Sequence, residues 1–179
     1  MRGMYPDLPL VGIEPAVKPA AQNHRGEKVA VMATPLTLHE EKFKQLVKRY
    51  ENLATIIPVP CPDLVEYVEK GILEGPELEG YLKDVLKPCL QEGVKAVVLG
   101  CTHFPLVKAA IGKVVGESVR IYDGGEGTAR QAKCLLAAKN LCTDQEKGHI
   151  CFESSAPEKE AYYEALYRKA AHIDSRVKL

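Results

Sequence analysis

The chain has 179 residues, among them 24 acidic and 24 basic side chains. This length suffices for one sizeable core, and the zero net charge excludes the strongly basic surface that nucleic-acid binding needs. The apolar runs are too short to span a bilayer and the first residues lack the apolar core of a signal peptide, so we expect a cytoplasmic protein without membrane or nucleic-acid partners. Six scattered cysteines without a Cys-x-x-Cys pair indicate reduced thiols rather than a disulfide framework or a zinc site.

Apolar and amphipathic stretches alternate along the chain. The first half predicts, in order, a strand over 9–13, a helix over 16–23, a strand over 28–33, a helix over 37–50, a strand over 54–59, a short helix closed by Gly71, and a long helix from Pro76 to about residue 92. The second half predicts a strand over 96–99, a helix over 105–114, a strand over 119–122, a helix over 126–139, a strand over 149–152 and a helix from Pro157 to about residue 171. This alternation implies right-handed βαβ units, so the fold class is α/β with a mostly parallel sheet flanked by helices.

Two threonines follow the strand over 28–33. Thr34 comes directly after it, and Thr37 suits the N-cap of the next helix, where Glu40 would complete a capping box. Hydroxyl groups at the end of a strand can also bind a carboxylate. A capping role and a binding role therefore both stay open for Thr37.

The stretch from Lys95 to Val107 concentrates most of the chemistry. Its apolar run over 96–99 is typical of a parallel strand covered on both faces, and Cys101, Thr102 and His103 follow a single glycine. Ligands of open α/β sheets bind just outside the carboxyl ends of such strands. Since Pro105 suits the first turn of a helix, the loop offers a thiol, a hydroxyl, an imidazole and a helix N-terminus to a small anionic ligand.

A cysteine is useful as a base only as an accessible thiolate, which a helix N-terminus or a neighbouring cation favours. Extended backbone would point Cys101 and His103 to the same side. The alternative is that Cys101 is a small buried apolar residue and His103 a substitute helix cap. Taken singly, Glu69 reads as a solvated charge and the other five cysteines as core or incidental residues.

Two further patterns indicate no site. The run over 123–127 lacks the spacing of a dinucleotide-binding loop and the lysine of a P-loop. Cys101 and His103 have no further ligand pair to complete a metal site. We therefore expect neither a cofactor nor a metal.

Several motifs in a fixed order resemble glutamate racemases, within a superfamily that includes aspartate and hydantoin racemases. They are Gly-Cys-Thr-His-Phe-Pro-Leu over 100–106, Ala-Thr-Pro-Leu-Thr over 33–37, the segment over 61–69 that ends in Glu69, and the run Asp-Gly-Gly-Glu over 123–126. The strand and helix over 12–20 also fit. The superfamily relatives usually carry a glutamate in place of His103, so this histidine favours the glutamate branch.

The resemblance implies a cofactor-independent reaction that supplies D-glutamate for peptidoglycan. One thiolate removes the α-proton of glutamate, and a second thiol reprotonates the carbanion from the opposite face. Carried over, Cys101 is one acid/base, Thr102 and His103 bind substrate, and His103 also assists Cys101. The resemblance also implies that Thr34 and Thr37 hold a carboxylate and that Glu69 orients or polarises the site.

One departure from the pattern is large. The family begins with an Asp-Ser-Gly-rich strand and a later Cys-Asn-Thr motif that holds the other catalytic cysteine, and this chain has neither. We therefore expect an N-terminally truncated racemase, in which residues 1–118 form the second racemase-type domain and residues 119–179 are the C-terminal segment of the first. Such a chain would not racemise efficiently, and apolar surface left uncovered makes a homo-oligomer an open question.

Two other interpretations stay open. In the first of these, the chain is a racemase of aspartate or hydantoin type. A panel of substrates would distinguish it from a glutamate racemase. Alternatively it is a non-catalytic remnant domain that binds an amino acid or a protein partner, for which the missing cysteine is the main support.

Overall fold

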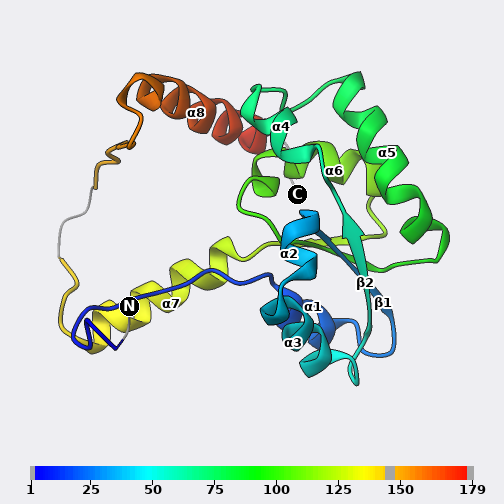
Figure 1. The fold of residues 1–179 in the computed structure, drawn as a ribbon, viewed down its shortest axis with the longest axis horizontal. Coiled ribbons are helices and arrows are strands. Elements are labelled where there is room, and N and C mark those ends of the chain that lie inside the picture. Colours follow the sequence, from blue (N-terminus) through cyan, green and yellow to red (C-terminus); the bar gives the residue numbers. More distant parts are fainter. Residues whose placement is uncertain (1–2, 144–147, 177–179) are drawn as a thin grey trace.

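The structure is a computed structural model that describes residues 3–143 and 148–176. Its centre is one sheet of four parallel strands in the spatial order β2-β1-β3-β4 (Figure 1). The strands are β1 (Lys28–Ala33), β2 (Thr55–Pro60), β3 (Ala96–Leu99) and β4 (Arg120–Tyr122). The prediction of a mostly parallel sheet flanked by helices is confirmed, and all four of these strands were predicted to within two residues at each end.

Helices fill most of the connections. They are α1 (Val17–Asn23), α2 (Pro35–His39), α3 (Glu41–Tyr50), α4 (Leu64–Glu69), α5 (Pro76–Gln91), the 3₁₀ turn η1 (Phe104–Val107), α6 (Lys108–Val115), α7 (Gly125–Ala138), the 3₁₀ turn η2 (Pro157–Lys159) and α8 (Glu160–Arg176). Across the described ranges, none of these helices is both long and apolar enough to cross a membrane.

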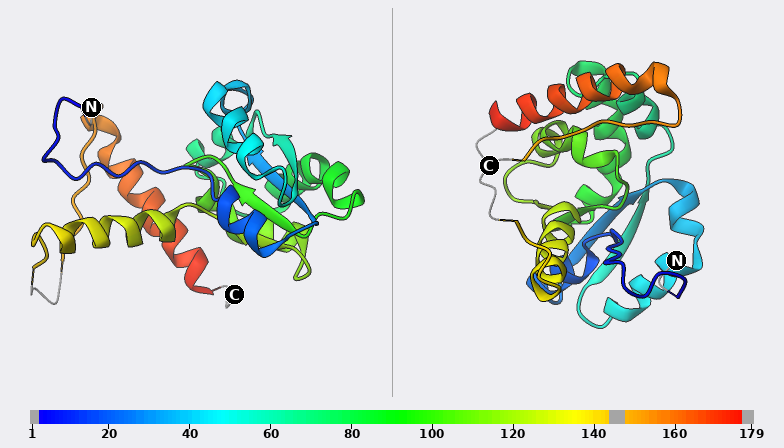
Figure 2. Two further views of the ribbon diagram at one scale, coloured as in Figure 1. Left: turned by 90° about the horizontal axis from the view of Figure 1, so that it is seen from below. Right: turned by 90° about the vertical axis from the view of Figure 1, so that its left-hand side faces the viewer.

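The strands are apolar on both faces because helices cover both. In β1, Val29 and Val31 point into a core shared with α1 and α3, whereas Ala30 and Met32 point into a larger core shared with α4, α5 and α6. This period of two is the ordinary geometry of a strand. The result is a three-layer sandwich, in which α1 and α3 lie on one side of the sheet and α5 and α6 on the other (Figures 1 and 2).

The connections reverse direction at the middle of the sheet. From β1 the chain passes through α2 and α3 to β2 on one side, and from β3 it passes through α6 to β4 on the other side. Since β1 and β3 are neighbours, their carboxyl ends define a topological switch point, where ligands of open α/β sheets bind. The loops that leave these two ends begin at Thr34 and at Gly100.

Two predicted strands are wrong. Residues 9–13 and 149–152 are irregular, and no described strand pairs with either. A strand needs a hydrogen-bonding neighbour, and the chain just before the first segment instead contacts the end of α7, where a Lys139 Nζ–H donates to Asp7 O at 2.7 Å. Ile13 and Ile150 are correspondingly exposed. Both segments were predicted as strands from their apolar content alone, which does not show whether a neighbouring strand is present.

The predicted start of the second helix is also wrong. Thr34 is the N-cap, and its hydroxyl accepts a hydrogen bond from the backbone N–H of Thr37, which lies inside α2. Glu40 is the N-cap of a separate helix, α3, and its side chain makes no capping hydrogen bond. The actual cap sits directly before Pro35, which has no N–H and suits the first helical position.

The predicted division at residue 118 stays a prediction. β4 lies beyond that position and pairs with β3, with Val97 opposite Ile121, so the sheet is continuous across it. α8 also returns to pack against η1 and α6.

Candidate active site

Gly100 lets the chain turn sharply as it leaves β3. Its N–H donates to Met32 O at 2.8 Å, and a Cβ atom at this position would lie 2.8 Å from the same oxygen. Only glycine tolerates so close an approach of two backbones. The turn places the next residue, Cys101, at the edge of the sheet beside the end of β1.

Three strand ends lie level at this edge. Thr34 and Cys101 each come two residues after the paired residues Met32 and Leu99. Cys61 follows Pro60, which pairs with Ala33, and its N–H donates to Ala33 O at 2.9 Å. The register of β2, β1 and β3 therefore brings two thiols and one hydroxyl group to the carboxyl edge of the sheet.

Cys101, His103 and Glu69 form a connected series of side chains. Cys101 Sγ lies 3.8 Å from His103 Nδ1, and His103 Nε2 lies 2.9 Å from Glu69 Oε1. The backbone is not extended here, because His103 has helical dihedral angles (φ −77°, ψ −31°). The contact between the thiol and the imidazole instead arises in the turn that leads into η1.

The Glu69 carboxylate determines the tautomer of the His103 imidazole. An ionised Glu69 can only accept, so His103 Nε2 must carry the hydrogen that it donates to Oε1. In a neutral ring, Nδ1 then has a free lone pair facing the Cys101 thiol. This arrangement can take the proton from the thiol and return it, which is what a thiol needs in order to act as a base or an acid.

Packing of α4 against η1 carries Glu69 to His103, although 34 positions separate them in the chain. Leu64 and Val68 of α4 are fully buried and anchor the helix. The side chains of His103 and Glu69 remain 33% and 39% exposed, so their pairing contributes more to orientation than to stability.

Four of the six predicted site residues line one or the other of two cavities. Thr102, His103 and Glu69 line a cavity of about 320 Å³ together with Leu106 and three residues of α8: Tyr163, Leu166 and Tyr167. The α8 residues were not predicted, although their spacing of three and four is the signal of a helix face.

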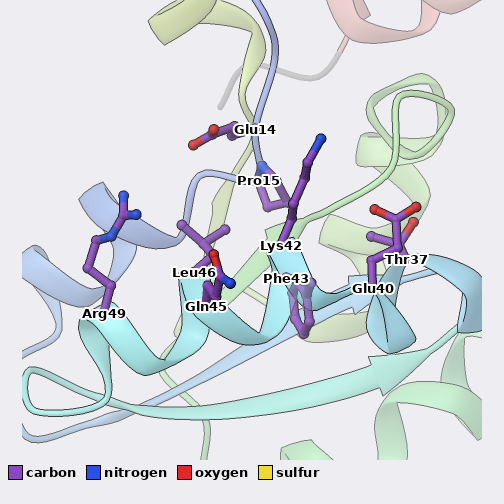
Figure 3. A pocket seen from close by; sticks show the side chains of 9 residues that line it. All are labelled: Glu14, Pro15, Thr37, Glu40, Lys42, Phe43, Gln45, Leu46 and Arg49. Carbon is purple, nitrogen blue, oxygen red and sulfur yellow. The ribbon is translucent and has the colours of Figure 1, made fainter.

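Thr37 lines the other cavity, of about 380 Å³, which also has a strongly charged rim (Figure 3). Thr37 lies next to Glu40 at one end of that rim, and Arg49 lies at the opposite end. Thr34 belongs to the same group, because its Oγ1 lies 3.0 Å from Thr37 Oγ1. The structure thus brings Cys101 and Glu69 into contact with His103, whereas Thr37 lines a separate cavity.

The other thiols of the core cannot serve as bases near neutral pH. Burial raises the pKa of Cys61 to about 12, with further contributions from the nearby Cys89 and Cys101 thiols. Burial also raises the pKa of Cys89, whose thiol donates to Leu86 O at 3.1 Å. The remaining three cysteines, at 134, 142 and 151, are exposed. Within the described part of the chain, no group of three or more His, Cys, Asp or Glu side chains is arranged to hold a metal ion.

The fold and the site define an α/β protein of parallel strands that presents a thiol, an imidazole and a carboxylate at its switch point. Residues 1–132 match the family described as Asp/Glu/Hydantoin racemase, and the chain belongs to this family.

Curated relatives in the family are glutamate racemases. The chain is 43% identical over 160 residues to that of Clostridium perfringens (strain ATCC 13124), covering 89% of this chain and 62% of the relative. It is 48% identical over 140 residues to that of Clostridium kluyveri (strain ATCC 8527), covering 78% and 54%. The chain thus spans 54–62% of the length of these curated relatives.

Solved structures agree with this assignment. A crystal structure of Escherichia coli glutamate racemase in complex with L-glutamate and the activator UDP-MurNAc-Ala matches with a TM-score of 0.73 at 31% identity, covering 91% of this chain and 62% of that one. The Thermus thermophilus glutamate racemase, in complex with β-chloro-D-alanine, matches with a TM-score of 0.65 at 28% identity, covering 94% and 62%.

Proposed function

We propose that this chain carries one of the two acid/base halves of a glutamate racemase, with Cys101 as the group that exchanges a proton with the α-carbon of glutamate. The observation that carries the proposal is the series Cys101, His103 and Glu69 at the switch point of the sheet. The curated relatives support glutamate as the substrate, and the E. coli enzyme has been crystallised with L-glutamate. We place this activity in the cytoplasm, where it would supply D-glutamate for peptidoglycan without a cofactor.

The proposed step consists of two successive proton transfers. His103 Nδ1 accepts the proton of the Cys101 thiol, and the resulting thiolate removes the α-proton of the substrate. The Cα–H bond breaks, an S–H bond forms, and the electron pair is delocalised into the substrate carboxylate. In the opposite direction the Cys101 thiol donates its proton to the carbanion, and the imidazolium restores the thiol.

The hydroxyl groups around Cys101 would hold the substrate. Thr102 and His103 border the same cavity as Glu69, and Thr34 lies level with Cys101 on the adjacent strand. We propose that Thr34 binds a substrate carboxylate from the β1 side and that Thr102 binds from the β3 side. Thr37 lines the other cavity, and we propose that it takes part in carboxylate binding through its hydroxyl, which lies 3.0 Å from that of Thr34. Glu69 would act through His103 rather than by touching the substrate.

A two-base racemase needs a second thiol on the far face of the substrate. Cys61 and Cys89 are buried and have raised pKa values, so neither qualifies, and the exposed Cys134, Cys142 and Cys151 do not line the cavity of His103 and Glu69. We therefore propose that this chain alone racemises poorly. We also propose that residues 1–118 are one racemase-type domain and residues 119–179 are a segment of another, since α7 has no buried residue of its own. A homo-oligomer is a further proposal, which the molar mass in solution would test.

The test of this function is a chimera. The N-terminal part of the Clostridium perfringens relative is fused ahead of this chain, and conversion of L-glutamate is followed by chiral chromatography. We expect racemisation that Cys101→Ser abolishes and that the exposed control Cys134→Ser leaves intact. Aspartate and a hydantoin serve as competing substrates. A folded chimera in which Cys101→Ser keeps full activity, or which prefers aspartate, would refute the proposal.

A further inference from the structure

Helix α8 passes close to α4 (Figure 1), and three of its residues line the same cavity as Glu69 and His103. The Tyr162 hydroxyl donates a hydrogen bond to the backbone carbonyl of Glu69. Seven residues further along, Lys169 Nζ donates to Gly71 O at 2.7 Å. Two side chains of α8 thus donate hydrogen bonds to the backbone of Glu69 and of Gly71, two residues further along.

These two donors share one face of α8 with its buried residues. Tyr162, Leu166 and Lys169 are separated by four and three positions, which places them on one side of a helix. Leu166 is only 8% exposed and Ala170 only 6%. The apolar residues therefore dock α8 on η1 and α6, and this docking brings the two polar donors to α4.

The end of α4 needs such partners. This helix has only six residues, and the last carbonyl groups of any helix have no partner within it. Gly71 lies in the left-handed region (φ 71°) just past the end of the helix, and the carbonyls of Glu69 and Gly71 accept the hydrogen bonds of Tyr162 and Lys169. A lysine ammonium group is favourable at this end of the helix dipole.

We infer that Tyr162 and Lys169 are positioning residues, which fix the last turn of α4 so that Glu69 reaches His103 and sets its tautomer. They touch neither the substrate nor the reacting thiol. The inference rests on the proposed function, because the tautomer matters only if Cys101 exchanges protons. The reactivity of Cys101 and the tautomer of His103 can nevertheless be measured without any turnover.

The experiment uses the full chain and reads two signals of the site. The rate of Cys101 alkylation by iodoacetamide is followed by peptide mass spectrometry, which separates it from the other five cysteines. The ring nitrogens of His103 are observed by long-range ¹H–¹⁵N correlation, which distinguishes the two tautomers. Glu69→Ala is the reference for complete loss of the carboxylate.

We expect Tyr162→Phe and Lys169→Met each to slow Cys101 alkylation by about two- to tenfold, the range that loss of one net hydrogen bond produces. Both should shift the His103 signals toward those of Glu69→Ala. Lys169→Arg keeps a donor and should retain the parent rate. Arg168→Met removes a cation that pairs with Glu164 on the solvent side of the same helix, and it should change neither signal.

The possible failures are distinguishable. If Glu69→Ala changes both signals and Tyr162→Phe and Lys169→Met change neither, while circular dichroism shows the same total helix content in all variants, the positioning role is wrong and the proposed series stands. If Glu69→Ala itself changes neither signal, the series does not operate and the positioning role falls with it. Equal slowing by Arg168→Met would show a general loss of α8 docking and would also overturn the inference.

Discussion

At the scale of single residues, the site depends on how closely backbones and charges approach at the ends of the strands. Gly100 brings the loop of Cys101 within hydrogen-bonding distance of β1, and Asp123 anchors the turn that follows β4. The place of Cys101 and His103 after a buried strand marked them as a candidate reactive pair, with a structural role as the alternative, and the family resemblance favoured the reactive role. Their partnership with Glu69 could not be predicted from spacing, because it depends on how α4 packs against η1.

Gly100→Ala tests the close approach of β1 and β3. The added Cβ would lie 2.8 Å from Met32 O, so the strands must separate, and we expect a loss of about 1–3 kcal/mol in the free energy of unfolding by urea. Gly112→Ala within helix α6 is the control, since the nearest atom to its new Cβ would be Ile121 Cδ1 of β4 at 3.8 Å, and it should be neutral or stabilising. Equal stability of the parent chain and Gly100→Ala would contradict this view of the turn.

Asp123 makes stability depend on pH. Burial tends to raise its pKa, but the hydrogen bond and charge of Lys108 (Nζ–Oδ2 3.0 Å) and the N–H of Gly125 outweigh burial and lower it. A lowered pKa in the folded state gives stability that is present above the unfolded pKa, about 3.9, and is lost as pH falls through the folded value. Asp123→Asn should therefore cost about 1 kcal/mol at pH 7.

The control for that change is the same pair of proteins in acid. Urea unfolding at pH 7 and at several pH values below 4 should show the difference shrinking as Asp123 becomes protonated in the parent chain. A difference between the two proteins that grows toward low pH would show that the assigned direction is wrong.

At the scale of elements, hydrophobic periodicity was informative wherever a partner surface exists. The predicted helix from Pro76 to about residue 92 is confirmed by α5, which buries Leu78, Leu82, Leu86 and Cys89, and the apolar run of β3 was predicted with its observed bounds. The same reasoning failed over 9–13 and 149–152, because a strand exists only where a neighbour supplies its hydrogen bonds. Periodicity within one segment carries no information about that neighbour.

Leu82→Ala tests the packing of α5 on the sheet. Leu82 is fully buried in the larger core, so its truncation leaves a cavity, and we expect a loss of about 2–5 kcal/mol in the free energy of unfolding. Lys83→Ala changes the neighbouring exposed position and should stay within about 0.5 kcal/mol of the parent. Similar effects of the two changes would mean that this face of α5 is not packed as described.

At the scale of the whole molecule, function depends on the order of the strands. Alternation of strands and helices predicted a parallel sheet, yet it could not give the order β2-β1-β3-β4, which long-range packing decides. That order puts the ends of β1 and β3 side by side and so makes Thr34 and Cys101 neighbours at one edge. Packing also returns α8 to the site, which local sequence patterns could not show.

The central claim is that Cys101 exchanges the α-proton of glutamate from one face. The most direct test is proton NMR of L-glutamate and, separately, D-glutamate with this 179-residue chain in heavy water. We predict slow loss of the α-proton signal from one enantiomer only, with retained configuration and no loss above background in Cys101→Ser. Rapid inversion by the chain alone would contradict the single-thiol site, and exchange that is absent or unchanged in Cys101→Ser would contradict the role of Cys101.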